Sequence, residues 1–333
     1  LLEVFYENFS ETDVFFFDEI QNVKGWEKFI NRLFGEGKKV FVTGSNARLL
    51  SSEFATALTG RHLKVELFPF SFKEYLSYKK FHLKEFYNTK EKAIIKKNFN
   101  QYLEYGGFPE VLKSKDKEEL SQIYRDILIK DLIVRFGIKE TKAFRELALY
   151  LLTNITSNIS YNNLKKILAF NSVTTVKNYI DYLEESYLMF TMPKYDFSLK
   201  KQIINNRKIY TIDTGLFNAV SFSFSENRGK QLENIVFLEL KRKGKEIYYH
   251  NNKYECDFIV RKGSNIQQAI QVSESVYNAY TRERELRGLA EALSVYKLNK
   301  GIILTYDEEE EIKYNGYKIM IIPIWKWLLS SND

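Results

Sequence analysis

The segment that decides the fold runs from Val14 to Glu19 and reads Val-Phe-Phe-Phe-Asp-Glu. An unbroken apolar run that ends in charged residues is typical of a strand buried on both faces of a parallel sheet. A helix with one apolar face is predicted next, and Gly35 breaks it. A second buried strand follows at residues 40–42. The strand–helix–strand order with a short crossover predicts a parallel α/β sheet.

The rest of the chain predicts three further regions, which gives an α/β multidomain protein. Residues 71–140 are mostly helical, and residues 141–212 contain three helices and two strands, a pattern typical of a winged helix-turn-helix. From Gly229 onward the predicted order is helix, three strands, helix and strand (229–243, 246–250, 255–260, 267–273, 281–297 and 301–306). The predicted domains are 1–70, 71–140, 141–212 and 213–333.

The composition excludes several classes of protein. The chain has 333 residues, of which 44% are hydrophobic, so it is too apolar to be disordered and long enough for two or three cores. The single cysteine, Cys256, excludes a disulfide framework and fits a reducing cytosol. No apolar run reaches the ~20 residues of a membrane span. We therefore expect a cytoplasmic protein with no membrane partner, and the net charge of +7 permits an anionic one.

Two adjacent carboxylates, Asp18 and Glu19, follow the first strand in the form of a Walker B motif. Nucleotide hydrolysis needs one carboxylate to hold Mg²⁺ and a second to orient the attacking water. The alternative is that Asp18 only caps the following helix. Polar residues Thr43 to Asn46 end the second strand, so they are expected at the same edge of the sheet, where open α/β sheets bind ligands. Arg61 is then placed either to reach a γ-phosphate or to lie on the surface.

Several segments together resemble the AAA+ type P-loop ATPases of archaea and bacteria, in particular those fused to a C-terminal domain of unknown function. The matching segments are 15–21, 40–46, 58–61, 67–76, 105–110 and 209–216. The resemblance implies ATP and Mg²⁺ as cofactors. It also implies these roles: Asp18 as the magnesium-associated acid, Glu19 as the water-positioning base, Ser45 and Asn46 as sensor residues, and Arg61 as an arginine finger.

One departure from this family concerns the phosphate loop, G-x-x-x-x-G-K-[ST], which should precede the Walker B strand. Only 17 residues precede Asp18, and none is glycine. The loop supplies the backbone cradle and the lysine for the phosphates. We therefore expect that the chain lacks its natural N-terminal portion, that the intact protein is an ATPase, and that these 333 residues alone bind ATP poorly.

The predicted winged helix is a candidate DNA-binding region. Residues 142–211 contain ten basic and five acidic residues. Polar residues on the third helix and lysines on the second are suited to phosphates and base edges in a major groove. The alternative is a winged helix used for packing or dimerisation, and the acidic residues 181, 184 and 185 favour it. The predicted DNA contacts are Lys165, Lys166, Thr174, Thr175, Lys177 and Asn178.

The C-terminal order of elements resembles the PD-(D/E)XK nuclease fold. Nucleases of that type place one acid on the first helix, one on a strand, and E-x-K on the next strand, so that the acids bind Mg²⁺ and the lysine positions water. The corresponding residues here are Glu233, Asp257, Gln271 and Ser273. Two acids remain, and no lysine occupies its position. We therefore predict a degenerate site, in which Glu283 or Arg284 are the remaining substitutes.

Three functions remain open from the sequence. The first is an ATP-driven, DNA-associated protein with a degenerate nuclease-like end. The second is an active Mg²⁺-dependent nuclease regulated by the ATPase part. The third is a protein-binding module, switched by nucleotide and independent of DNA, that contacts a protein partner or a second copy of itself. The charge excess of residues 142–211 favours the first over the third, and Gln271 with Ser273 disfavours the second.

Overall fold

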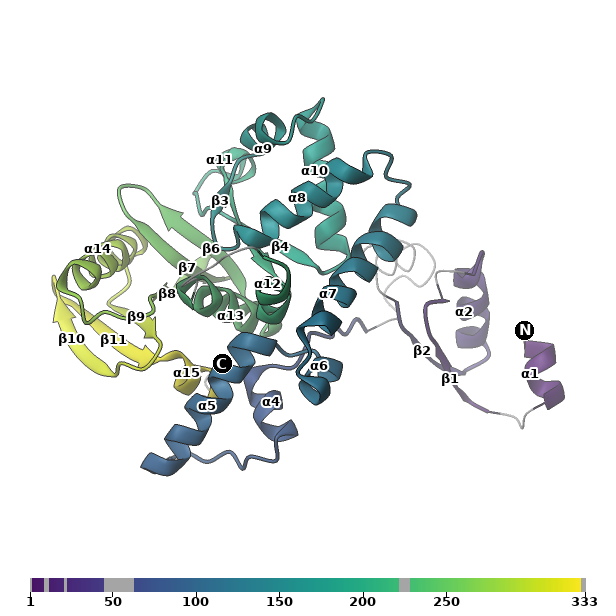
Figure 1. Cartoon of the computed structure of the whole chain (residues 1–333), viewed down its shortest axis with the longest axis horizontal. Coiled ribbons are helices and arrows are strands. Elements are labelled where there is room, and N and C mark those ends of the chain that lie inside the picture. The colour runs from purple at the N-terminus through teal and green to yellow at the C-terminus, as the bar shows by residue number, and fades with distance from the viewer. Residues whose placement is uncertain (1, 9–11, 21–22, 45–62, 222–227, 331–333) are drawn as a thin grey trace. The chain divides into compact units, whose positions relative to one another are not determined.

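The computed structural model describes residues 2–8, 12–20, 23–44, 63–221 and 228–330 (Figure 1). The chain divides into two compact units, one formed by residues 1–67 with 185–187 and the other by the remaining residues. In the described ranges, no helix has both the length and the apolar character needed to cross a membrane.

The first unit contains the predicted parallel α/β element. Strands β1 (Val14–Phe17) and β2 (Lys39–Val42) pair in parallel, and helix α2 (Trp26–Gly35) connects them. Helix α2 buries Trp26, Ile30 and Leu33, which recur at helical spacing. A short helix, α1 (Leu2–Asn8), precedes β1. The prediction of a mixed α/β chain with a parallel strand pair is confirmed.

Two aromatic side chains lie exposed on this strand pair. Phe16 is 75% exposed and Phe41 is 51% exposed, and their rings stack with centroids 4.8 Å apart. Phe15 and Phe17 alternate with Phe16 and pack toward the α2 side with Phe29. Among the described residues, therefore, only one face of the β1–β2 pair is packed.

The second unit begins with a helical region, as predicted. Capping boxes at Ser71–Glu74 and Asn88–Glu91 fix the starts of the first two helices. The π-helical segment η2 directly continues α7. The helices are α4 (Phe72–Tyr78), α5 (Thr89–Tyr105), α6 (Pro109–Ser114), α7 (Lys117–Asp126) and η2 (Ile127–Val134).

The next region has three helices and a small antiparallel sheet of order β3-β5-β4. The predicted three helices and two strands are present. The two-residue strand β3 and the helix α11 between the longer strands were not predicted. The elements are α8 (Thr141–Thr153), β3 (Asn158–Ile159), α9 (Tyr161–Ile167), α10 (Val173–Glu185), β4 (Met189–Pro193), α11 (Leu199–Ile204) and β5 (Arg207–Thr211).

The C-terminal region is a mixed sheet of order β10-β11-β9-β8-β7-β6, with α14 packed against β7, β8 and β9. Figure 1 shows this sheet in green to yellow, with α14 along one side. The predicted order of elements from residue 229 to 306 agrees with the structure. The elements are α12 (Thr214–Val220), α13 (Arg228–Arg242), β6 (Glu246–Asn251), β7 (Glu255–Lys262), β8 (Asn265–Val272), α14 (Ala279–Tyr296), β9 (Lys300–Thr305), β10 (Glu310–Tyr314), β11 (Tyr317–Pro323) and α15 (Ile324–Leu329).

Three segments far apart in the sequence meet at one point, which we call the Gly107 junction (Phe70, Gly106, Gly107, Asp213 and Gly215). The backbone N–H of Gly107 donates to Asp213 Oδ2 at 2.7 Å, and the N–H of Phe70 donates to the Gly107 carbonyl at 2.8 Å. Asp213 also accepts from the N–H of Gly215 at 2.7 Å, which caps α12. A single buried carboxylate thus holds backbone from two regions together.

The junction requires glycine because of its close approaches. A Cβ added to Gly107 would lie 2.3 Å from the Phe70 carbonyl oxygen, and one on Gly106 would lie 1.8 Å from Asp213 Oδ1. Gly106 also has φ +74°, a region that favours glycine. At Gly107 the close atoms are backbone and cannot move away as a flexible side chain would. At Gly106 they belong to Asp213, which is held by its hydrogen bonds to Gly107 and Gly215, so neither position accepts alanine without rearrangement.

We predict that Gly107→Ala lowers the free energy of unfolding by about 1–3 kcal/mol, because the added methyl overlaps a backbone carbonyl. Gly229→Ala is the matched control: it lies in α13 with no atom near the added Cβ and no positive φ, so it should be neutral or slightly stabilising. Thermal unfolding followed by circular dichroism compares the two. Equal melting temperatures for both variants would contradict the importance of the junction.

Candidate functional site

The carboxyl ends of β1 and β2 bring Asp18 and Thr43 together. Phe17 lies opposite Val42 in the parallel register, and the N–H of Thr43 donates to the Phe17 carbonyl at 2.8 Å. The Thr43 hydroxyl donates to Asp18 Oδ1. The exposed Asp18 carboxylate and the Thr43 hydroxyl thus form a small group of oxygen atoms at the sheet edge, which is the type of ligand Mg²⁺ prefers.

Glu19 follows with φ +48°, an uncommon backbone conformation for a non-glycine residue. This conformation turns the chain sharply after the strand, and the Glu19 side chain is partly buried. The other predicted residues of this edge, Ser45, Asn46 and Arg61, lie outside the described residues.

The predicted DNA contacts lie on α9 and α10. The exposed members of the set are Lys166, Thr174, Lys177 and Asn178, whereas Lys165 and Thr175 are partly buried. The three exposed residues on α10 share one face with the exposed Asp181, which brings a negative charge to the same stripe. The Ser172 hydroxyl accepts from the N–H of Thr175, and Lys177 Nζ lies 5.5 Å from the Tyr161 ring centroid.

A lysine from β5 enters the C-terminal region. Lys208 and Tyr210 are two residues apart on β5, so both side chains point to the same face of the strand, toward α13. The Tyr210 ring stacks on Phe237 with centroids 4.0 Å apart. Glu233 precedes Phe237 by four residues on α13, so the two side chains share one helix face. The alternation of β5 and the periodicity of α13 therefore bring Lys208 to Glu233.

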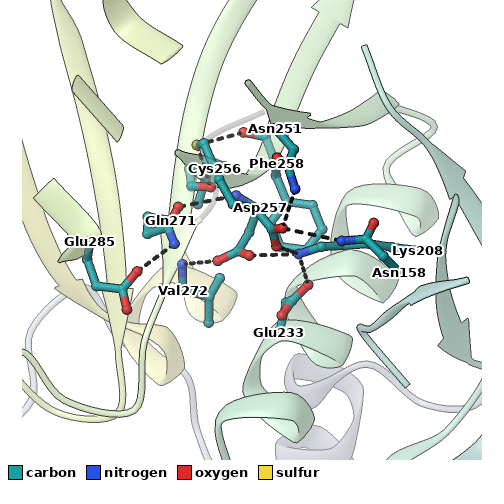
Figure 2. Close-up of polar contacts among 12 residues, drawn as sticks. Asn158, Lys208, Glu233, Asn251, Cys256, Asp257, Phe258, Gln271, Val272 and Glu285 are labelled. Atoms are coloured by element: carbon teal, nitrogen blue, oxygen red, sulfur yellow. Dashed lines mark hydrogen bonds and ion pairs between the residues drawn. The ribbon is translucent and has the colours of Figure 1, made fainter. Parts of the chain in front are cut away.

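The Lys208 ammonium is the centre of an ionic cluster of four residues (Lys208, Glu233, Glu255 and Asp257). Figure 2 shows Lys208 with Glu233 and Asp257 in close-up. Its Nζ lies 2.7 Å from Glu255 Oε1, 2.9 Å from Asp257 Oδ1 and 3.0 Å from Glu233 Oε1. The Lys208 side chain is only 2% exposed. Two of the four, Glu233 and Asp257, are acids predicted for a nuclease-like site. The cluster joins the β3-β5-β4 sheet to α13 and β7.

A second group of contacts continues from Asp257 toward α14. The N–H of Val272 donates to Asp257 Oδ2 at 2.9 Å, and the N–H of Asp257 donates to Gln271 Oε1 at 3.2 Å. The Gln271 amide donates to Glu285 Oε2 at 2.6 Å, and Arg284 pairs with Glu285. Figure 2 shows Gln271 between Asp257 and Glu285. Gln271 is therefore a bridging group between β7 and α14.

Ser273, at the position where a nuclease of this type has lysine, takes no part in the cluster. Its hydroxyl donates to the Ser275 carbonyl at 3.0 Å. Glu283, named above as a substitute, pairs with Arg287 and accepts from the Tyr314 hydroxyl. No lysine occupies the E-x-K position, as the sequence shows, but Lys208 supplies an ammonium to the two acids from a different region of the chain.

Burial and charge act in opposite directions on this cluster. Burial alone would lower the pKa of Lys208, yet the carboxylates of Asp257 and Glu233 raise it well above the ordinary lysine value. Burial raises the pKa of Glu233 to about 8, although Lys208 and the Tyr210 hydroxyl favour its ionised form. Lys208 is therefore fully charged at neutral pH, and Glu233 binds a proton more readily than an exposed carboxyl does.

The Lys208 ammonium neutralises part of the negative charge of the cluster. In the described ranges, no group of three or more His, Cys, Asp or Glu residues is arranged to hold a metal ion. The carboxylates that would ligate a metal ion contact the Lys208 ammonium instead. The sequence did not predict that Lys208, Glu255 and Glu285 belong to this site. The only signal for Lys208 was its position two residues before Tyr210 in a predicted strand.

Three family models match consecutive parts of the chain. The model described as "AAA domain" matches residues 1–76, "Domain of unknown function (DUF8612)" matches 96–227, and "Domain of unknown function (DUF4143)" matches 228–327. The first includes Asp18, Glu19 and Thr43. The second includes α9, α10 and Lys208, and the third includes the three acids of the cluster.

Curated relatives align along nearly the whole chain. "Uncharacterized protein MJ1544" of Methanocaldococcus jannaschii is 38% identical over 340 residues, covering 96% of this chain and 76% of the relative. An "Uncharacterized protein" of Haemophilus influenzae is 31% identical over 328 residues, covering 95% of this chain and 78% of the relative. No solved structure matches the chain.

We predict that Glu233 makes the stability of the protein depend on pH. A carboxyl whose pKa is raised on folding stabilises the fold at pH values below its ordinary pKa, and this contribution is lost as the pH rises through about 8. The free energy of unfolding should fall between pH 5 and 8, by at most about 1.4 kcal/mol per pH unit from this group. Glu233→Gln, whose amide oxygen still accepts from Lys208 and Tyr210, should flatten the profile. Denaturant unfolding at several pH values tests this, and parallel profiles would contradict it.

Proposed function

Because the chain belongs to the family of MJ1544 and combines an AAA domain with DUF8612 and DUF4143 domains, we propose that the complete protein binds and hydrolyses ATP at the β1–β2 edge. The observation that carries this proposal is the contact between Asp18 and Thr43 at the carboxyl ends of two parallel strands. Open α/β sheets bind ligands at this edge. The segment that matches the AAA model supplies both residues.

The proposed roles follow from the positions of the two acids. The Asp18 carboxylate would hold Mg²⁺, and Mg²⁺ when bound neutralises charge on the phosphates. Glu19, the next residue, would accept a hydrogen bond from the attacking water and orient it. The Thr43 hydroxyl donates to Asp18 and so orients that carboxylate. Hydrolysis also needs a phosphate-binding loop, and no G-x-x-x-x-G-K-[ST] segment occurs in the 333 residues.

We further propose that α9 and α10 contact DNA. The support is the exposed face formed by Lys177, Thr174 and Asn178 on α10, with Lys166 on α9. Lysines bind phosphates without regard to sequence, while threonine and asparagine side chains suit base edges. Asp181 on the same face would limit affinity, so we expect binding that depends strongly on salt.

The C-terminal region is proposed to be a degenerate relative of PD-(D/E)XK nucleases that does not cut DNA. Its two acids, Glu233 and Asp257, are paired with Lys208 and are almost fully buried. Neutral Gln271 replaces a metal-binding carboxylate, and Ser273 provides no base for water at neutral pH. These features support an architectural role for this region.

We predict that Glu19→Gln lowers ATP turnover by the complete protein roughly 100-fold or more, while ATP affinity changes little, because a water-orienting group acts mainly in the transition state. Glu36→Gln is the control. Glu36 lies between the end of α2 and the start of β2, at the opposite end of the strands from Asp18. Steady-state hydrolysis and calorimetry measure the two quantities, and unchanged turnover in Glu19→Gln would refute the assignment.

A second prediction concerns DNA. Replacing Lys165, Lys166 and Lys177 together by alanine should weaken duplex binding. It should also lower the slope of log K against log salt concentration by the equivalent of roughly two to three phosphate contacts. Fluorescence anisotropy over a range of salt concentrations measures both effects. The matched control replaces three exposed lysines of the C-terminal sheet, Lys262, Lys300 and Lys313. If both triple variants bind as the parent does, α9 and α10 do not form the DNA contact.

A further inference from the structure

The carboxylates around Lys208 are each held by a group other than Lys208. Tyr210 OH donates to Glu233 Oε1 at 2.8 Å, the N–H of Val272 donates to Asp257 Oδ2 at 2.9 Å, and the Asn251 amide donates to Glu255 Oε2 at 2.9 Å. The three carboxylates thus have supports on β5, β8 and β6. Their arrangement does not depend on the ammonium alone, so it should persist in part when the ammonium is removed.

The ammonium itself occupies the point at which three carboxylate oxygens converge, within 2.7–3.0 Å. Carboxylate oxygens are also the ligands of hard divalent cations such as Mg²⁺ and Mn²⁺. An ammonium and a metal ion are both positive and cannot share this point. The lysine side chain therefore takes the place of a free cation, with the difference that it is covalently attached to β5.

We propose that Lys208 is a tethered counter-cation: its insertion from β5 blocks divalent-cation binding at Glu233, Glu255 and Asp257, and its withdrawal would convert these residues into a cation site. Insertion of the Lys208 ammonium and occupation of the site by a metal ion are then mutually exclusive. Only Lys208 and the three acids take part, so neither ATP hydrolysis nor DNA binding is required.

Charge balance supports this exclusion. With Lys208 in place, one buried positive charge neutralises part of the negative charge of three carboxyl groups. Without it, Asp257 and Glu233 would be left buried with no cation nearby, which is unfavourable in a medium of low polarity. Either protons or a cation from solution must then replace the lost charge. A divalent cation is the replacement best suited to three converging oxygens.

The test uses Lys208→Ala, which removes both the charge and the atoms that fill the point of convergence, in the otherwise unchanged 333-residue chain. The probe is Mn²⁺, measured by thermal unfolding at constant ionic strength and by electron paramagnetic resonance of free Mn²⁺. We expect the variant to melt below the parent in chelator. At a hundredfold excess over its Kd, Mn²⁺ should raise the melting temperature by roughly 5 °C. The parent should show no such response.

The double variant Lys208→Ala with Asp257→Asn is the matched control, and it should lose the Mn²⁺ response. Any Mn²⁺ binding that survives in it belongs elsewhere in the chain, for example at Asp18. If Lys208→Ala is insoluble in chelator, Lys208→Gln, which keeps hydrogen-bond donors, is measured in its place. Recovery of soluble protein only with Mn²⁺ would also support the proposal.

Two results would overturn it. One is the absence of any Asp257-dependent Mn²⁺ response in both Lys208 variants, which would mean that the acids form only a structural ion pair. The other is an Asp257-dependent Mn²⁺ response of equal size in the parent, which would mean that the ammonium and the metal ion do not compete.

Discussion

A single buried ammonium is the constraint on which the second unit depends. Lys208 is almost completely removed from water, and a charge in that position is stable only when opposite charges surround it. The carboxylates that surround it come from α13 and β7, so these elements and β5 must be placed together. Removing one partner from such a pair typically costs about 3–5 kcal/mol. The same residues that define the C-terminal cluster thereby fix the β3-β5-β4 sheet.

Contacts beside the Lys208 cluster also connect β5 to α13. The Asn234 side chain, fully buried next to Glu233, accepts from the N–H of Thr211 and donates to its carbonyl, as a neighbouring strand would. The Tyr210 ring lies flat on Phe237. Polar pairing and aromatic packing therefore connect β5 to α13 at consecutive residues of both elements. This continuity explains why residues 68–184 and 188–333 form one compact unit.

Local patterns in the sequence predicted most elements correctly. The apolar run before Asp18 and the apolar face of α2 were sufficient for the parallel strand pair, because strand and helix periodicity are local properties. Strand β3 was missed since two residues carry no pattern. Helix α11 was missed because its apolar residues, such as Leu199 and Ile204, are exposed and form no inward face.

The acidic run at 307–311 has the composition of a solvated turn, but only part of it is solvated. Glu308 is buried and accepts from the N–H of Val276, and Glu310 and Glu311 belong to β10. The role of Lys208 also could not be predicted from the sequence, because a lysine at the start of a strand is usually solvated. Its burial depends on Glu233 and Asp257, which are 25 and 49 residues away. Such charge pairing is a property of the tertiary structure.

The Gly107 junction has a consequence for the order in which the chain folds. Its central hydrogen bond joins residues that are 106 positions apart, so it cannot form until Asp213 has been synthesised and has left the ribosome. Until then the loop between α5 and α6, which contains Gly106, has no carboxylate to pair with. Contacts of such sequence separation also slow folding, because a long loop must close before they form. We therefore expect the helical region 71–140 to complete its folding only after the middle region has emerged from the ribosome. During synthesis it should be the part most exposed to chaperones and proteases.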